Sequence, residues 1–448
     1  MPAGGTWVAQ NKIRPGAYIN FVYRAKNGGL TVGDRGTIAV ATDLPWGPDG
    51  EIIPVTSEDM LNGKSQAKVG FTAYDGDVSL PLRLAFASAT KALVFKSNRG
   101  GQKAKIADET TGYTIEAKYP GVVGNTITVS VEKDTPTAGD FQVNVFINAI
   151  KKESFVVKTA DALSEIDSDW VKISGDSLVA TSGLTLSGGT NGTSLTDYTD
   201  FFEALKYKTF QAVAINSEDT SVATALATWT KDQRETKGKK FVSVVLNKPD
   251  FDYEGVISVD QGFKSKNETI TPVLCTIYIA SLSAGALVNE SLTCRLINDA
   301  VEIINPVDED EIDKALQSGR LILTYRQDGK VVIEKDINTL HTFTDDRGYP
   351  FSKNRVMRCL DEIGNSVALK FNQNYAGKVD NNNIGRNQFK SEIVNLMDVL
   401  QNMGAIKNFE AADVTVLPGN DIDSVVVDLN IEPVDAMEKL YMTVYVSA

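Results

Sequence analysis

Both ends of this 448-residue chain carry a short uncharged segment in which apolar side chains recur at every second position. Residues 15–23 and residues 440–448 contain no Asp, Glu, Lys or Arg. Such alternation is typical of a β-strand with one buried face. Chain ends are normally polar and frayed, so each segment is predicted to be a strand that needs a sheet to join. The alternating residues are Ala17, Ile19, Phe21 and Tyr23 in the first segment and Leu440, Met442, Val444 and Val446 in the second.

Hydrogen bonding alone does not stabilise either strand. A strand of this length makes about half a dozen hydrogen bonds worth ~1 kcal/mol each, whereas ordering its backbone costs about 1–2 kcal/mol per residue. The apolar face must therefore be buried. Both strands can pair within their own subunit, or one or both can be donated to a neighbouring copy by β-strand addition. Repeated donation around a heterologous contact would build a ring or an open helix of subunits.

The length and the changing hydrophobic pattern indicate several domains. At about 150 residues per domain, the chain length corresponds to roughly three. Residues 1–95, rich in Gly and Pro with short alternating runs, are expected to form an N-terminal arm and a β-rich domain. Residues 96–192 contain two alternating runs, 127–132 and 141–147, which predict a hairpin within an inserted all-β sandwich.

Residues 193–345 switch to alternating buried strands and helices, which predicts an open α/β sheet. The strands are expected at residues 210–215, 241–246 and 273–278. The last of them is expected to lead into a helix through Leu287 and Leu292.

Residues 346–448 are predicted to form an α+β assembly domain that ends in an arm. Two apolar stripes at helical spacing, 356–371 and 389–403, predict amphipathic helices. Strands are expected at residues 414–417, 424–431 and 440–446. The expected fold class is therefore a multidomain α+β and α/β protein, with an N-terminal β-rich segment, an inserted sandwich, an open α/β sheet and terminal strand arms.

Composition argues against several classes of protein. Lys and Arg number 45 against 58 Asp and Glu, a net charge of −13, and a phosphate backbone demands clustered positive charge. The chain has one histidine and three cysteines without a C-x-x-C pair, which favours reduced thiols over a disulfide framework or a zinc site. No signal peptide and no membrane span are recognised, so a soluble protein made inside the cell is expected.

The candidate catalytic motifs are weak. Lys64 and Ser65 follow a glycine as in a phosphate loop, but Glu58 stands where that loop needs another glycine. His341 is the single imidazole on which any Ser-His or Cys-His mechanism would depend. We therefore expect no catalytic residue, no cofactor and no metal site.

Short motifs follow one another along the chain in a specific order. They begin with the opening strand at residues 14–21, and residues 119–125 and 186–192 border the predicted β-sandwich. Further motifs are C-terminal, at residues 336–340, 353–356, 375–381, 385–386, 413–416 and 439–444. Taken in this order, these motifs resemble those of the tail sheath proteins of contractile-tailed bacteriophages and related prophages, of the type found with Gram-positive hosts. The C-terminal motifs are the best matches.

The resemblance implies a structural subunit that self-assembles as stacked hexameric rings around a tail tube and contracts to drive the tube through the host envelope. It implies that terminal arms extend to neighbouring subunits and complete their C-terminal sheets. The implied N-terminal arm is Ala17, Tyr18, Ile19, Phe21, Val22 and Tyr23. The implied C-terminal arm is Leu440, Tyr441, Met442, Val444, Tyr445 and Val446. The implied acceptor sheet contains Val414, Val416, Val425, Val427, Leu429 and Ile431.

The partners implied are further copies of the chain, a tail tube protein, and baseplate and tail terminator proteins, with no nucleic acid and no membrane insertion. The implied location is the virion tail, and the host cytoplasm during assembly. A replicating phage and a phage-tail-like bacteriocin both fit the pattern. Two other readings stay open: a non-contractile polymerising virion or surface protein, and an α/β hydrolase-like enzyme that uses His341.

Overall fold

The computed structural model describes residues 3–5, 16–18, 33, 35–133 and 140–446. The chain divides into two compact units, which are described separately. The smaller contains Met1–Val32, Ser366–Asn402 and Asn408–Ile431, and the larger contains Gly33–Asn365, Met403–Lys407 and Glu432–Ala448.

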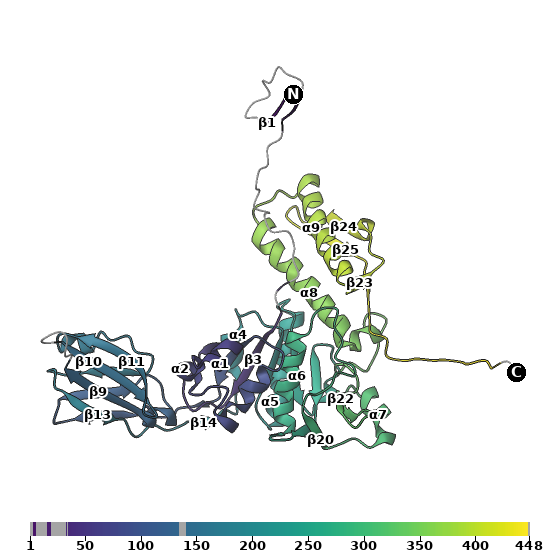
Figure 1. Ribbon diagram of the computed structural model, residues 1–448. Coiled ribbons are helices and arrows are strands. Elements are labelled where there is room, and N and C mark those ends of the chain that lie inside the picture. The colour runs from purple at the N-terminus through teal and green to yellow at the C-terminus, as the bar shows by residue number, and fades with distance from the viewer. Residues whose placement is uncertain (1–2, 6–15, 19–32, 34, 134–139, 447–448) are drawn as a thin grey trace. The chain divides into compact units, whose positions relative to one another are not determined.

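A six-stranded sheet forms the centre of the larger unit (Figure 1). Its neighbours pair in parallel except for one antiparallel edge strand, β4. Strands buried on both faces are typical of such parallel sheets. In spatial order the strands are β17 (Val256–Val259), β16 (Val242–Leu246), β15 (Ala212–Ile215), β3 (Thr37–Thr42), β5 (Lys91–Lys96) and β4 (Ile52–Thr56).

This sheet corrects one expectation from the sequence. Strands β3, β4 and β5 come from the region assigned to an N-terminal β-rich domain, yet β3 pairs directly with β15 of the predicted α/β region. The physical reason is burial, because β3 and β5 are apolar on both faces and must lie inside a covered sheet. The boundary expected near residue 95 therefore does not separate two sheets.

Helices cover both faces of this sheet (Figure 1). One face, with Ile38 and Val40 of β3, packs against α6 (Pro272–Gly285) and α3 (Leu80–Ala85). The opposite face, with Ala39 and Ala41, packs against α4 (Thr199–Leu205) and α5 (Thr220–Glu235). Shorter elements at the edge are α1 (Ser57–Asn62) and α2 (Ser65–Val69).

Helix α6 replaces the strand predicted at residues 273–278, so that prediction is wrong. The helix is buried nearly all round and therefore has no helical period to read. Its start does carry local signals, because the Thr271 side chain accepts a hydrogen bond from the Leu274 amide and Pro272 occupies the first turn. Its end lies at Gly285, where a Cβ would come within 2.4 Å of the Ser88 carbonyl oxygen. The helix expected through Leu287 and Leu292 is absent from these described residues.

The larger unit contains further small sheets. In one, β18 (Gly262–Ser265) pairs with both β19 (Thr269–Ile270) and β20 (Ala300–Ile304). The remaining pairs are β21 (Leu323–Tyr325) with β22 (Val331–Ile333), β23 (Ile406–Lys407) with β26 (Glu432–Pro433), and β6 (Asn98–Arg99) with β14 (Thr193–Ser194). One short helix, α7, spans Ile312–Gln317.

A β-sandwich is inserted between β6 and β14. The hairpin predicted there is confirmed, since β9 (Ile127–Lys133) and β10 (Phe141–Ile147) pair antiparallel. The two layers share one apolar core that includes Trp46 and Trp170. One layer has the order β11 (Ile150–Val157), β10, β9, β13 (Thr181–Thr185), and the other β12 (Val171–Ser174), β8 (Tyr113–Ala117), β7 (Lys105–Asp108). The expected multidomain mixed α/β architecture with a β-sandwich is thus confirmed.

Both predicted C-terminal helices are present. Helix α8 spans Asn354–Lys370 and is followed by one π-helical turn, and α9 spans Asn383–Asn402. In the smaller unit, α9 packs against a hairpin of β24 (Val414–Pro418) and β25 (Val425–Leu429), the two strands expected there.

The two terminal segments have different outcomes. Residues 434–446 have no strand assignment, so the segment predicted as a strand at 440–446 joins no sheet of its own chain. It runs away from the larger unit as a single extended segment (Figure 1). At the other end, β1 (Ala3–Gly5) and β2 (Gly16–Tyr18) pair in parallel.

Candidate assembly interface

The hairpin of β24 and β25 has two outer edges without a strand partner in the described part of the chain. Its register pairs Val414 with Leu429 and Val416 with Val427. An exposed edge of this kind is a template on which a further strand can pair.

The predicted acceptor residues are those whose backbone groups point to these outer edges. Just beyond the two ends of the hairpin, the Asn430 amide donates to the Asp413 carbonyl and the Gly419 amide donates to the Ser424 carbonyl. Antiparallel pairs alternate between bonded and non-bonded positions, so the pairs that contain Val425, Val427 and Leu429 are the non-bonded ones. Their N–H and C=O groups are directed outward, toward an added strand. The same holds for Val414 and Val416 on β24.

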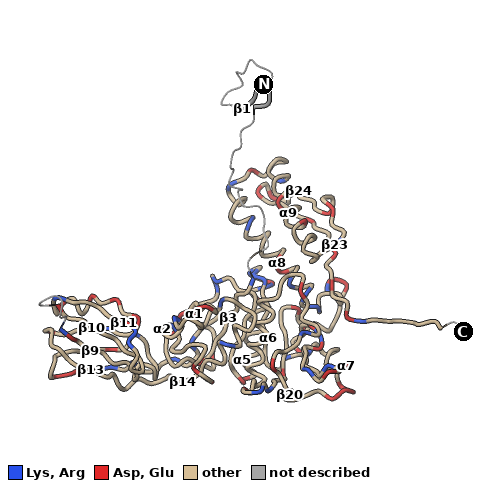
Figure 2. Tube along the Cα trace, viewed as in Figure 1, with Lys and Arg blue, Asp and Glu red and all other residues tan. Residues whose placement is uncertain are grey.

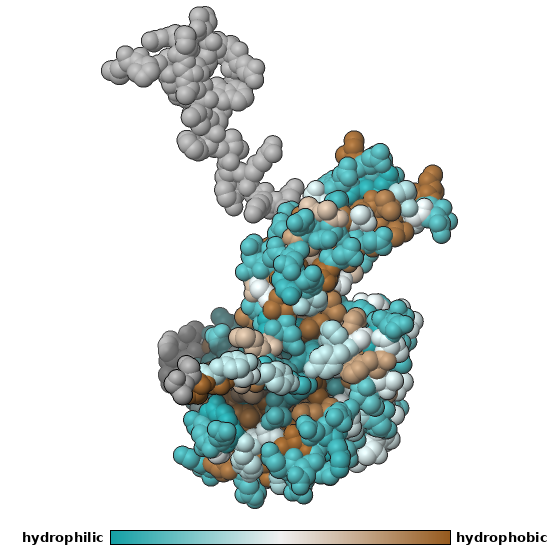
Figure 3. Space-filling view, turned by 90° about the vertical axis from the view of Figure 1, so that its right-hand side faces the viewer, coloured by the Kyte–Doolittle hydropathy of each residue, from teal (hydrophilic) through white to brown (hydrophobic). Residues whose placement is uncertain are grey.

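The side chains of the acceptor residues have a half-buried face. Val414 is buried, and Val416, Val425, Val427, Leu429 and Ile431 are half-buried. On the opposite face of the hairpin, Leu417 and Val426 lie opposite each other and are 52% and 47% exposed. Brown, hydrophobic residues are visible on the surface in Figure 3, and the exposed hydrophobic residues of this unit include Leu417 and Val426 of the hairpin.

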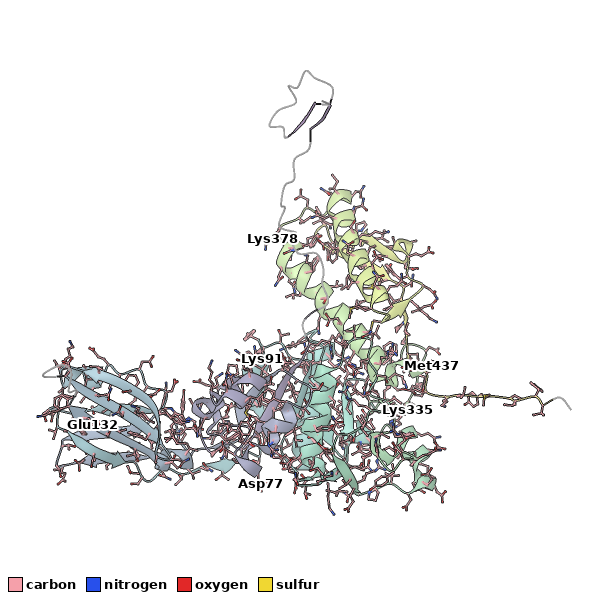
Figure 4. The ribbon with its side chains drawn as sticks, in the orientation of Figure 1. Asp77, Lys91, Glu132, Lys335, Lys378 and Met437 are labelled. Atoms are coloured by element: carbon pink, nitrogen blue, oxygen red, sulfur yellow. The ribbon has the colours of Figure 1, made fainter. Side chains whose placement is uncertain are left out.

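A groove of about 500 Å³ borders the hairpin within the smaller unit. Its walls include Phe371, Tyr375 and Phe389, whose rings cluster with the Tyr375 and Phe389 centroids 4.7 Å apart. Burial raises the pKa of Tyr375, which keeps its hydroxyl neutral. Lys378, labelled in Figure 4, stands on the same lining. Sequence reasoning missed this groove, because its residues are spread over the helix end, the loop and the hairpin.

The loop beside this groove is tied to the hairpin turn. The Asn381 side-chain amide donates to the Ile422 carbonyl at 2.9 Å and to the Ser424 carbonyl at 2.8 Å. Arg386 donates in turn to the Asn381 side-chain oxygen at 2.8 Å. These bonds hold the turn, and with it both outer edges of the hairpin, in a defined position on the unit.

The C-terminal arm predicted from the sequence is almost entirely solvent-exposed. Figure 2 shows charged residues at the base of the segment and none along most of its length. Isolated exposed apolar residues are ordinary, but a contiguous run of them marks an interaction surface. The exposed fractions of Leu440, Tyr441, Met442, Val444, Tyr445 and Val446 lie between 69% and 91%.

The predicted N-terminal arm falls mostly outside the described residues. Ala17 and Tyr18 lie in β2, and their backbone pairs in parallel with β1. Ile19, Phe21, Val22 and Tyr23 lie outside the part of the chain that the structure describes.

The weak catalytic candidates named above form ordinary hydrogen bonds and ion pairs with neighbouring residues. His341 Nδ1 lies 2.8 Å from the Thr339 carbonyl oxygen and 3.4 Å from Asp252 Oδ1, and no serine or cysteine is among these contacts. The Ser65 hydroxyl donates to the Phe71 carbonyl. Burial raises the pKa of the Cys275 thiol to about 12, as it does for Cys359, so neither is a thiolate nucleophile near neutral pH.

Over the described ranges, no cluster of three His, Cys, Asp or Glu side chains is placed to bind a metal ion. Nor does any described helix combine the length and apolar character needed to cross a membrane. The features that stand out in the described part of the chain are the exposed segment 440–446 and the open edges of the β24–β25 hairpin.

Three family descriptions match successive parts of the chain. Residues 99–191 match the phage tail sheath protein beta-sandwich domain, residues 189–339 its central domain, and residues 346–447 the phage tail sheath C-terminal domain. Two proteins of Bacillus subtilis match along 99% of this chain. They are the uncharacterized protein YqbK, 32% identical over 99% of its own length, and the phage-like element PBSX protein XkdK, 30% identical over its full length.

The chain therefore belongs to the phage tail sheath protein family, and it is a structural component of a phage or prophage tail. Solved structures agree. A sheath tail protein from Listeria innocua superposes with a TM-score of 0.81 at 31% identity, covering 93% of this chain and 96% of that one. A sheath tail protein from Desulfitobacterium hafniense superposes with a TM-score of 0.78 at 33% identity, covering 95% of this chain and 99% of that one. The helical sheath of the anti-feeding prophage in its contracted state shares the fold alone. It is 11% identical, with a TM-score of 0.52, and the match covers 97% of this chain and 98% of that one.

Proposed function

We propose that this protein is the subunit of a contractile tail sheath, in which copies stack as hexameric rings around a tail tube. In this proposal the N-terminal and C-terminal arms of each subunit add strands to the β24–β25 hairpins of neighbouring subunits. The observation that carries the proposal is the complementarity between an exposed, uncharged, alternating segment at 440–446 and a two-stranded hairpin with open edges.

Strand addition would remedy two weaknesses of the separate subunit. The hairpin is supported by α9 on one face, but its outer edges carry N–H and C=O groups that a further strand would pair. The arm in turn has no surface on which to bury its apolar side chains. Because the half-buried face of the hairpin packs on α9, an added strand extends that face and buries alternate residues of the arm.

Contraction follows from subunits that move as nearly rigid bodies while their arms stay engaged. A change of ~1–3 kcal/mol per subunit, the scale of ordinary coupling energies, sums over many copies into work on the tube. Similarity to the anti-feeding prophage sheath in its contracted state supports this reading at the level of the fold. The partners proposed are the tail tube protein, the baseplate proteins and the tail terminator protein.

The first test is electron microscopy of the purified protein over a range of concentrations. We expect hollow cylinders with helical symmetry, because arms that join each subunit to two neighbours propagate a closed ring or helix. Flat arrays would favour the non-contractile surface polymer instead. Subunits that remain monomeric at every concentration, with or without a tube template, would contradict the proposal.

A further inference from the structure

Lys353 is a buried lysine immediately before helix α8, and its side chain is only 2% exposed. Its ammonium group pairs with the carboxylate of Glu438 and lies 3.3 Å from Asp435 Oδ2. A buried ammonium is stable only when it is paired and hydrogen-bonded. Both carboxylates precede the uncharged segment 440–446 by a few residues, so the lysine holds the base of the C-terminal arm.

The change from anchored to exposed backbone occurs within a few residues. Val434 donates its amide to the Ala405 carbonyl at 2.9 Å, and Glu438 accepts a hydrogen bond from the Thr293 hydroxyl at 2.8 Å. Met437 between them is fully exposed and lies where the segment leaves the unit (Figure 4). The arm therefore starts from a defined point.

The contacts of Glu438 continue into a buried network around Asp336. The Asp336 amide donates to the Thr293 hydroxyl at 3.0 Å. The Asp336 carboxylate accepts from Asn354 at 2.9 Å and from Arg358 at 2.5 Å, and both of these residues are on α8. Asp336 and Arg358 are almost fully buried. The network thus joins the base of the C-terminal arm to the first turns of α8.

The first described residues after the N-terminal segment are held by α8 and α6. The Gly33 amide donates to Glu362 Oε1 on α8 at 2.7 Å. The Arg35 guanidinium donates to the Ala286 carbonyl at 2.7 Å and to the Ser283 carbonyl at 3.2 Å, at the end of α6. Carbonyls at a helix C-terminus attract a cation, so Arg35 has a specific position.

Charged groups near both bases lie on one side of α8. Burial, reinforced by the nearby positive charge of Arg358, lowers the pKa of Arg35 to about 10, and the negative charge of Glu362 opposes this. Arg358 and Glu362 are four residues apart and lie on one side of the helix. Gly33 therefore contacts Glu362 of α8, and Glu438 at the base of the C-terminal arm contacts Lys353, directly before that helix.

We propose that Lys353, Asp336, Arg358 and Glu362 form one buried anchor that holds the bases of both terminal arms on α8. These four are positioning residues, since they would set where the arms begin and make no contact with a neighbouring subunit themselves. The proposal rests on the arm function proposed above. Its consequence is mechanical: tension that reaches Glu438 from the C-terminal arm passes through this network to α8, the helix that also holds Gly33.

The test is hydrogen exchange by mass spectrometry on full-length subunits held below the assembly concentration. Lys353→Met should raise the exchange rate of amides in residues 434–438 about tenfold or more, because the carboxylates lose their buried partner. Lys353→Arg, which keeps the charge, should restore most of the protection. Lys264→Met is the matched control, since Lys264 pairs with Glu302 on the surface and is 45% exposed. Unchanged exchange in Lys353→Met would overturn the proposal.

Asp336→Asn tests whether the anchor is a single network. We expect faster exchange both in residues 434–438 and in residues 35–38. Faster exchange in residues 434–438 alone would overturn the proposal of a shared network. If Lys353→Met does not fold, Glu438→Gln is the second variant, because it keeps a hydrogen-bonding partner for Thr293 and leaves Asp435 to pair with the lysine.

These results are independent of whether the arms assemble the protein. If deletion of the C-terminal arm leaves polymerisation intact, the proposed function fails whatever the exchange data show. If the deletion abolishes polymerisation and Lys353→Met leaves exchange unchanged, only the anchor fails.

Discussion

Deletion of residues 440–448 is expected to raise the protein concentration needed for polymerisation by at least about 100-fold, which corresponds to ~2.7 kcal/mol per contact. The deletion removes main-chain hydrogen bonds and the burial of alternate apolar side chains at each intersubunit contact. The subunit itself should keep its melting temperature, because residues 440–446 are exposed and make no strand pair with their own chain. Sedimentation across a concentration series, with calorimetry on the same samples, measures both quantities.

Point substitutions test whether polymerisation depends on burial of one face of the C-terminal arm, which a deletion of the whole segment cannot show. Val444→Asp places a charge on the face that carries Leu440 and Met442, and Thr443→Asp places the same charge on the other face. Because alternate residues of a strand point in opposite directions, the first variant should impair polymerisation far more than the second. Equal effects would argue against pairing as a strand, and unimpaired cylinders from the full deletion would refute the C-terminal arm. Deletion of residues 1–23 applies the same test to the N-terminal arm.

Val427→Pro is expected to weaken polymerisation while the hairpin remains paired. The outward N–H of Val427 would be lost, and a proline without an N–H cannot bond to an added strand. The ladder between β24 and β25 uses the neighbouring positions and is retained. We expect the protein concentration needed for polymerisation to rise at least about tenfold, because the variant loses one main-chain hydrogen bond and the close approach of the added strand together.

The control for this edge is Val427→Thr, which keeps the N–H and a β-branched shape. Val416→Pro tests the opposite edge of the hairpin, because Val416 is the non-bonded partner of Val427. If polymerisation is impaired in only one of the two proline variants, that variant identifies the edge to which an arm adds. Wild-type polymerisation in both, with circular dichroism confirming that each is folded, would contradict strand addition at this hairpin.

Elements with a clear local period were predictable. The β9–β10 hairpin, the amphipathic helices α8 and α9, and the β24–β25 hairpin all match their patterns. In each of them one face is buried and the other is exposed, so the order of apolar and polar residues records the geometry. Helix α6 lacks that contrast because it is buried nearly all round, and its six-residue apolar run at 273–278 could not be told from a strand.

Pairing between distant segments was not predictable. The two outer parts of the central sheet are separated in sequence by the whole β-sandwich, and β3 meets β15 across more than 170 residues, as the pairing of Ile38 with Ala212 shows. A strand pattern specifies that a partner is needed but not which strand supplies it. The same is true of the buried Lys353, since its partners Asp435 and Glu438 lie more than 80 residues away in the sequence.

The C-terminal segment shows most clearly what residue order determines and what the tertiary structure decides. Alternation and lack of charge at 440–446 are enough to predict that this stretch needs a sheet, because those properties depend only on residue order. Whether its own chain supplies that sheet depends on the three-dimensional arrangement of all other strands. The tertiary structure decides that point: it leaves the segment exposed and directs the backbone groups of Val427 and Val416 outward, since hydrogen-bond direction is set by strand register and not by side-chain sequence.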